Sequence, residues 1–213
     1  MTQATDWTTY YSKPKSKFST VTQKITLSKL AAYMKKYADG EIDIIELGGG
    51  NSCFAQELTE RLNVISYSIV DNCEIAVEKF KQMNLPGCAY QADLTAGNIG
   101  VEIEKRFDVV YSVGLIEHFR GKDIEKVIAS HFRLCKPGGI VLISVPTPTL
   151  QYRFIRKMME VFRVWGFPDE RPLRYNEISN IIERYGKVHE YRINRKLPLT
   201  QLMVITIMDE KII

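Results

Sequence analysis

Apolar and polar positions follow two alternating patterns along most of the chain. Short apolar runs typical of buried strands occur at Asp43–Leu47, Ile65–Val70, Cys88–Ala92, Phe107–Val113 and Ile140–Val145. Between them, apolar residues at helical spacing predict helices over 22–38, Ser52–Leu62, Cys73–Met83 and Lys122–Leu134. Strands that alternate with helices indicate βαβ units, which build a parallel sheet with helices on both faces. We therefore expect an α/β fold with a doubly wound, mostly parallel sheet.

The pattern changes after residue 146. Tyr175–Tyr185 predicts a helix, and Lys187–Asn194 and Gln201–Met208 predict two strands joined by a short loop. Strands so close in sequence are usually antiparallel, so we expect an antiparallel strand near one edge of the sheet. Residues 147–174 interrupt the alternation with one apolar stripe of Leu150, Phe154, Met158, Val161 and Trp165. This stripe fits either an ordinary packed helix or a lid over a ligand site.

The chain length of 213 residues suits a single domain spanning 1–213. We divide it into an N-terminal arm and helix (1–40), a core (41–146), a lid-like insertion (147–175), and a C-terminal helix and hairpin (176–213). The four cysteines form no C-x-x-C pair, so neither a metal site nor a redox motif is expected. The chain shows no signal peptide and no apolar run that could span a bilayer. We expect a cytoplasmic protein without membrane insertion.

The net charge of +4 is unevenly distributed. Residues 1–36 contain seven Lys and one Asp, whereas the remainder contains 22 basic and 24 acidic residues. The basic excess is therefore a property of the leading segment. It fits a solvated helix and arm, and it also leaves open an anionic small molecule, a nucleic acid or an acidic membrane surface as a partner.

The strongest motif is the segment Glu46-Leu47-Gly48-Gly49-Gly50-Asn51-Ser52, where a predicted strand ends in a glycine turn and a helix begins. Glycines let the backbone approach a ligand closely, and the free N–H groups at a helix start face that ligand. The spacing departs from G-x-G-x-x-G because Cys53 stands at the third glycine position. The Glu46 carboxylate would repel a pyrophosphate, but it could accept hydrogen bonds from a cationic amino-acid group.

Two further carboxylates follow the next predicted strands. Asp71 lies 21 residues after Gly50, a distance at which an acidic residue holds ribose hydroxyls in dinucleotide sites. Asp93, in Gln91-Ala92-Asp93-Leu94, could accept a hydrogen bond from an exocyclic adenine amine. Each aspartate alone could instead cap a helix or a turn. Together with the glycine turn, they favour a nucleoside site.

Two more segments complete the pattern: Phe107–Phe119, which contains Glu117-His118, and Leu134-Cys135-Lys136-Pro137-Gly138-Gly139. In order and spacing, the five segments resemble class I S-adenosylmethionine-dependent methyltransferases, and the last two resemble the small-molecule branch. The resemblance covers about residues 40–146 and implies a Rossmann-like fold, S-adenosylmethionine as cofactor, and a small-molecule acceptor. It also implies a set of cofactor-binding residues: Glu46, Gly48 and Gly50 around the methionine part, Asp71 and Asn72 at the ribose, Asp93 and Leu94 at the adenine, and Ser112 and Val113 on the methionine side.

The methyl acceptor is most simply a hydroxyl oxygen, with His118 as its base. His118 follows the carboxyl end of the fourth predicted strand, and imidazole accepts a proton near neutral pH. The alternative is a packed histidine that holds the loop. Glu117 could pair with the cofactor sulfonium or the substrate, or could only begin a helix.

Other functions stay open at this point. RNA is a second candidate acceptor, because Tyr10, Tyr11 and Phe18 are interleaved with lysines in the leading segment. A protein that binds S-adenosylmethionine without catalysis is a third possibility. The position of Cys53 argues against a nicotinamide-dependent enzyme.

Overall fold

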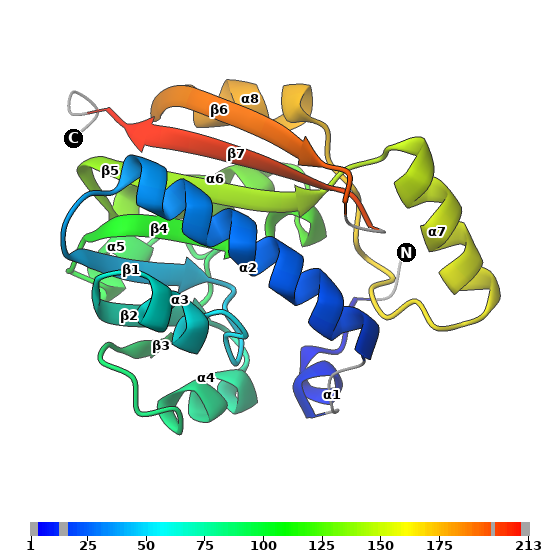
Figure 1. Ribbon diagram of the computed structural model, residues 1–213, viewed down its shortest axis with the longest axis horizontal. Coiled ribbons are helices and arrows are strands. Elements are labelled where there is room, and N and C mark those ends of the chain that lie inside the picture. The colour runs from blue at the N-terminus through cyan, green and yellow to red at the C-terminus, as the bar shows by residue number, and fades with distance from the viewer. Residues whose placement is uncertain (1–3, 13–16, 197–198, 210–213) are drawn as a thin grey trace.

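A computed structural model describes residues 4–12, 17–196 and 199–209 of the chain. Its centre is a seven-stranded sheet in the order β3-β2-β1-β4-β5-β7-β6 (Figure 1). Strands β1 to β5 run parallel, and β7 is antiparallel to both β5 and β6. The strands are β1 Ile42–Leu47, β2 Val64–Asp71, β3 Ala89–Gln91, β4 Phe107–Val113, β5 Cys135–Pro146, β6 Gly186–Asn194 and β7 Gln201–Met208. The predicted α/β fold is confirmed, including the antiparallel strand near one edge.

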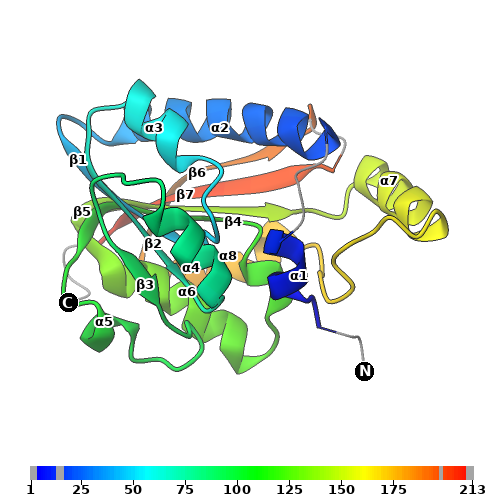
Figure 2. The ribbon, with the colours of Figure 1, turned by 90° about the horizontal axis from the view of Figure 1, so that it is seen from below.

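Helices cover both faces of the sheet (Figure 2). Helices α2 (Lys17–Tyr37), α3 (Ala55–Arg61) and α4 (Glu74–Lys81) pack on one face, and α5 (Ile99–Glu102), α6 (Lys122–Leu134) and α8 (Tyr175–Ile182) pack on the other. Successive strand residues point to opposite faces of the sheet. Ile44 therefore packs in the core under α2, α3 and α4, and Ile45 packs in the core under α5, α6 and α8. All six residues of β1 are buried, including the carboxylates of Asp43 and Glu46.

The N-terminal segment is more ordered than its sequence suggests. Helix α1 spans Trp7–Ser12, and α2 begins at Lys17 rather than near residue 22. These residues of the predicted N-terminal arm are therefore helical, whereas 1–3 and 13–16 lie outside the described residues. Helix α1 contacts α4 and has no buried residue of its own, so long-range packing and not periodicity orders it.

The predicted helix over Ser52–Leu62 is shorter in the structure. Ser52 has a positive φ of 27° and forms part of the turn, and α3 begins at Ala55. The Ser52 hydroxyl accepts a hydrogen bond from the Ala55 N–H at 3.2 Å. Ser52 therefore supports the start of the following helix.

Helix α7 (Leu150–Val161) projects from the body of the molecule (Figures 1 and 2). Its apolar stripe faces outward: Leu150 is 85% exposed and Phe154 69%. The interpretation as an ordinary packed helix is therefore wrong for this stripe. Tyr152, on another side of the helix, is the residue of α7 that is buried.

Candidate functional site

A cavity of about 610 Å³ lies where the carboxyl ends of the parallel strands meet. Its lining includes Glu46 from the end of β1, Asp71 from β2, Val113 from β4 and Pro146 from β5. This is the position at which open α/β sheets bind ligands, and the volume suits a small molecule with its cofactor.

Most of the predicted cofactor residues meet in this cavity: Glu46, Gly48, Asp71, Asn72, Asp93, Leu94 and Val113 all line it. Ser112 does not line it, so its contact with the cofactor stays a prediction. Its side chain points to the opposite face of β4, where its hydroxyl hydrogen bonds to His131 Nε2 at 2.9 Å. Side chains alternate along a strand, so Val113 can face the cavity only if Ser112 turns away.

Gly50 also stays out of the cavity lining, so its predicted role beside the cofactor stays a prediction. The ring of Tyr11 covers it, and a Cβ added at Gly50 would lie 2.3 Å from that ring. Gly50 has a positive φ of 54°, so a side chain here would be strained as well as crowded. Its N–H donates to Asp71 Oδ2 at 2.8 Å, so Gly50 supports the site through Asp71.

Glu46 belongs to a buried polar network. Its Oε2 accepts hydrogen bonds from the Ser52 hydroxyl at 2.5 Å and the Tyr67 hydroxyl at 2.7 Å, and Tyr67 in turn bonds to the Tyr111 hydroxyl. Burial raises the pKa of Glu46 to about 7, although these hydrogen bonds oppose the rise. Tyr67 and Tyr111 were not singled out in the sequence, where their regular strand positions look like ordinary core.

Asp71 ends β2 with both carboxylate oxygens engaged by the backbone. Oδ2 accepts the Gly50 N–H, and Oδ1 accepts the Cys73 N–H at 2.8 Å. Burial raises the pKa of Asp71, whereas these backbone N–H groups lower it. Each carboxylate oxygen has a second lone pair, so each can also accept a hydrogen bond from a hydroxyl of a bound ribose.

Asp93 and Leu94 follow β3 at the far side of the cavity. Asp93 is exposed, and its Oδ1 accepts both the N–H and the hydroxyl of Thr95 at 2.8 Å. Leu94 is 6% exposed and presents an apolar surface beside it. The turn-capping and adenine-binding interpretations of Asp93 are therefore compatible, because capping uses Oδ1.

Aromatic side chains of α1 close one side of the cavity. Trp7, Tyr10 and Tyr11 all line it. The Trp7 ring centroid lies 5.0 Å from that of His118 and 5.9 Å from that of Tyr11. Lys79 on α4 donates a hydrogen bond to the Tyr11 backbone oxygen. In this arrangement α1 covers the glycine turn.

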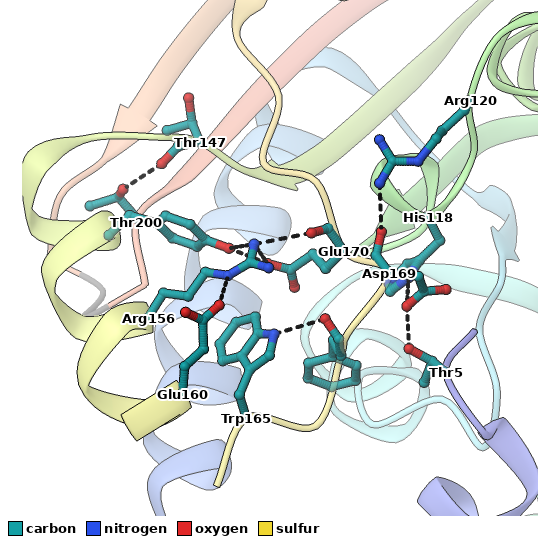
Figure 3. A network of polar contacts seen from close by, with 12 residues as sticks. Thr5, His118, Arg120, Thr147, Arg156, Glu160, Trp165, Asp169, Glu170 and Thr200 are labelled. Atoms are coloured by element: carbon teal, nitrogen blue, oxygen red, sulfur yellow. Dashed lines mark hydrogen bonds and ion pairs between the residues drawn. The ribbon is translucent and has the colours of Figure 1, made fainter. Parts of the chain in front are cut away.

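His118 lines the cavity and is held by two distant segments (Figure 3). Its Nδ1 lies 3.1 Å from Asp169 Oδ1, and the same oxygen accepts a hydrogen bond from the Thr5 hydroxyl. Because a carboxylate only accepts, neutral His118 carries its proton on Nδ1, which makes Nε2 the basic atom. Burial lowers the pKa of His118, whereas the charge of Asp169 opposes that change. The imidazole is therefore neutral at neutral pH.

Glu117 and Glu170 add two carboxyl groups to the cavity lining. Glu117 is 1% exposed, and burial followed by the charge of Glu170 raises its pKa well above the usual range. Burial also raises the pKa of Glu170 to about 7, even though the Tyr152 hydroxyl donates to its Oε1. Sequence reasoning identified Glu117 but not Glu170 or Asp169, which come from the irregular loop after α7.

The described residues contain no group of three or more His, Cys, Asp or Glu side chains that could hold a metal ion. None of their helices has both the length and the apolar character to cross a membrane. The cytoplasmic location stays a prediction.

The comparison with protein families matches residues 22–186 to a model described as a methyltransferase domain. The chain belongs to this family. The match includes the strands and turns that supply Glu46, Asp71, Asp93 and His118. It begins within α2 and ends at Gly186, the first residue of β6, so the helix α1 that covers the glycine turn lies outside it.

Solved structures share the fold at low sequence identity. Magnesium protoporphyrin IX methyltransferase from Synechocystis PCC 6803, solved with bound SAH, has a TM-score of 0.73 at 11% identity and covers 96% of this chain and 94% of its own. The N-methyltransferase NodS from Bradyrhizobium japonicum WM9, in complex with S-adenosyl-l-homocysteine (SAH), has a TM-score of 0.64 at 12% identity, covering 92% and 90%. The fold is that of the class I methyltransferases.

Curated relatives match a shorter part. The ubiquinone biosynthesis O-methyltransferase of Pseudomonas fluorescens is 26% identical over 101 residues, which are 47% of this chain and 43% of the relative. The protein of the same name from Pseudomonas aeruginosa matches to the same extent. The chain thus spans less than half the length of the curated relatives it matches.

Proposed function

We propose that the protein transfers the methyl group of S-adenosylmethionine to a small molecule, and that the acceptor atom is a hydroxyl oxygen. One observation carries the proposal: the carboxylates of Glu46, Asp71 and Asp93 stand at three strand ends around one cavity. Among the described residues that line this cavity, none is Lys or Arg. The lining therefore suits a cationic nucleoside with free ribose hydroxyls and would repel the pyrophosphate of a dinucleotide.

The relatives agree with this proposal. Two structural neighbours were solved with SAH, and the curated relatives are named as O-methyltransferases. When bound, the cofactor supplies a methyl group activated by a positively charged sulfur. Glu46 would bind its amino-acid part, Asp71 its ribose, and Asp93 with Leu94 its adenine.

The remaining residues align the acceptor and receive its proton. An acceptor hydroxyl next to His118 would be positioned to receive the methyl group that the bound cofactor would supply. The hydroxyl proton passes to His118 Nε2, and Asp169 stabilises the resulting imidazolium. The aromatic side chains of α1 exclude water from the reacting atoms.

Labelled cofactor tests the proposal directly. We expect S-adenosylmethionine, and not NAD, to raise the melting temperature of the protein, because only a species that binds the folded state stabilises it. Incubation with labelled cofactor and fractionated metabolite pools should then give a labelled small molecule in mass spectrometry. Label found in an RNA fraction would support the alternative acceptor, and cofactor binding without any labelled product would support a binding protein.

The first testable prediction concerns pH and Glu46. SAH should bind about tenfold more tightly at pH 8 than at pH 6, because its ammonium group prefers the ionised Glu46 carboxylate, whose pKa is about 7 in the free protein. Binding is weaker at low pH because the Glu46 carboxyl is neutral below a pKa of about 7 and must lose a proton when SAH binds. Titration calorimetry at several pH values measures this effect.

Glu46→Gln provides the control for that experiment. It removes the titrating group and should leave the affinity for SAH low and nearly independent of pH over the same range. A pH dependence that persists unchanged in this variant would assign it to Asp71 or Glu170 instead.

The second prediction concerns α1 as a cover of the site. Deleting residues 2–12 should leave the sheet folded but lower turnover, because Trp7, Tyr10 and Tyr11 then no longer exclude water from the cavity. Trp7→Ala should give part of the same loss, since Trp7 contacts both His118 and Tyr11. Steady-state kinetics alongside circular dichroism separates the two effects. Full activity in the truncated protein would refute the role of α1.

A further inference from the structure

We call the part of the cavity lined by Glu117, His118 and Glu170 its acceptor end, to distinguish it from the part lined by Glu46, Asp71 and Asp93. Glu117 reaches the acceptor end from the short helix η1 (Ile116–His118), and Glu170 from the loop between α7 and α8. Figure 3 shows Glu170 among the polar contacts that join this loop to α7. Two segments far apart in the sequence thus place two carboxyl groups at one end of the cavity.

Glu117 is the more unusual of the two groups. It is almost completely buried, yet within the described part of the chain its Oε2 has no hydrogen-bond partner. Its electrostatic neighbours are the carboxyls of Glu170 and Asp169, which disfavour its charge further. A buried polar atom without a partner costs free energy, so the unpartnered Oε2 at a cavity wall points to a ligand that makes the missing hydrogen bond.

Nearby arginines do not supply that donor. Arg156 Nη1 donates to the Tyr152 hydroxyl and to the Glu170 backbone oxygen and lies 3.9 Å from Glu170 Oε1, while its Nε donates to Glu160. Arg171 points toward α8, where it pairs with Glu177. Neither arginine belongs to the cavity lining.

Aromatic rings line the same cavity as these carboxyl groups. Trp7, Tyr152 and Phe167 line the cavity, and Tyr152 donates its hydroxyl to Glu170. Rings combined with carboxylates form an environment in which a desolvated ammonium group gains both ion pairing and cation–π attraction. Lys24, Lys29, Lys35 and Lys36, the described lysines behind the expectation of an anionic acceptor, do not line the cavity.

We infer that the acceptor molecule carries a cationic amine, which binds between Glu117 and Glu170 while its hydroxyl group lies at His118. This inference rests on the proposed methyl transfer and names the class of substrate: a small hydroxylated amine. The amine donates to the unpartnered Oε2 of Glu117 and separates the two carboxyl groups, and the aromatic rings cover its carbon skeleton.

Two series of matched probes test the inference with the protein saturated in SAH. The first series is tyramine, para-ethylphenol and para-hydroxyphenylacetate, which share a hydroxylated ring but are cationic, neutral and anionic. The second series is aminobutanol, pentanol and hydroxybutanoate, which vary the charge in the same way on an aliphatic chain. Titration calorimetry should show the cation binding about tenfold or more tightly than the neutral member in at least one series, as expected for charge-assisted hydrogen bonds.

Glu117→Gln and Glu170→Gln should each remove most of that preference while leaving the affinity for SAH unchanged. Glu57→Gln is the matched control, because Glu57 lies exposed on α3 in a pair with Arg61 and should change nothing. Glu117→Gln preserves the shape of the side chain, and Glu170→Gln tests the same site should the first variant be unstable.

The inference would be overturned by no preference for the cation in either series, by an equal or tighter anion, or by a cation preference that survives in both glutamine variants. A loss of SAH affinity in Glu117→Gln would assign Glu117 to the cofactor instead and would also overturn it. Failure of the unaltered protein to bind SAH would refute the proposed function, and the inference with it.

Discussion

Replacing His118 by alanine is expected to lower kcat by about 10²–10⁴-fold, the usual contribution of a general base. The affinity for SAH should stay nearly unchanged, because His118 contacts α1 and Asp169 rather than the carboxylates at the ends of β1, β2 and β3. His189→Ala is the matched control, since His189 is exposed on β6 and does not line the cavity. Single-turnover kinetics with the cofactor prebound measures the chemical step.

The pH dependence of kcat gives a second test of the same residue. The neutral imidazole is the active base, so the rate should rise as pH increases through the pKa of His118. Burial holds that pKa below its usual value of 6.5, so the midpoint should also lie below 6.5. A profile that is flat on the acid side, with chemistry rate-limiting, would exclude His118 as the base.

Asp169 acts on the reaction through His118 and is a positioning residue. Asp169→Asn keeps an oxygen that can accept from Nδ1 but removes the charge that opposes the lowered pKa. We expect a smaller loss of kcat than in His118→Ala, together with a shift of the midpoint to lower pH. A purely structural role would lower the activity without moving that midpoint.

The parallel strands could be predicted because burial on both faces leaves a largely apolar run, as in Ile140–Val145 of β5. The carboxyl ends of parallel strands meet at one edge of the sheet, and this geometry alone predicts that Glu46, Asp71 and Asp93 lie together. Ser112 lies outside the cavity lining because of the alternation of side chains along a strand. A motif assigns two neighbouring residues to the ligand, but a strand can direct only one of the two side chains toward it.

The acceptor end was not predictable in the same way. Asp169 reaches His118 across 51 residues of sequence and Thr5 across 164, and no local pattern marks either contact. Helix α1 has six residues and packs through rings that look like exposed aromatics in the sequence. Helix α7 misled for the opposite reason, because its apolar stripe faces outward while Tyr152 and Arg156 hold the helix to the loop.

The second large effect is expected at Asp71, where alanine should weaken SAH binding by roughly 10²–10⁴-fold. Two hydrogen bonds from ribose hydroxyls to a charged acceptor, at about 1.5–3 kcal/mol each, account for this range. Asp123→Ala on the exposed side of α6 is the control and should bind normally. Calorimetry gives the affinities, and unchanged binding in Asp71→Ala would remove this residue from the site.

Asp71 also holds the N–H groups of Gly50 and Cys73, so its loss could weaken binding by disturbing the glycine turn. A deoxyribose analogue of SAH separates the two causes. The unaltered protein should bind the analogue less tightly than SAH, because the analogue lacks a hydroxyl that would donate a hydrogen bond to Asp71. If Asp71 contacts the ribose, the alanine variant should bind the two ligands with nearly equal affinity, and the coupling between the two changes measures the contact. A variant that is weaker for both ligands but still prefers SAH to the same extent would show that Asp71 only shapes the turn.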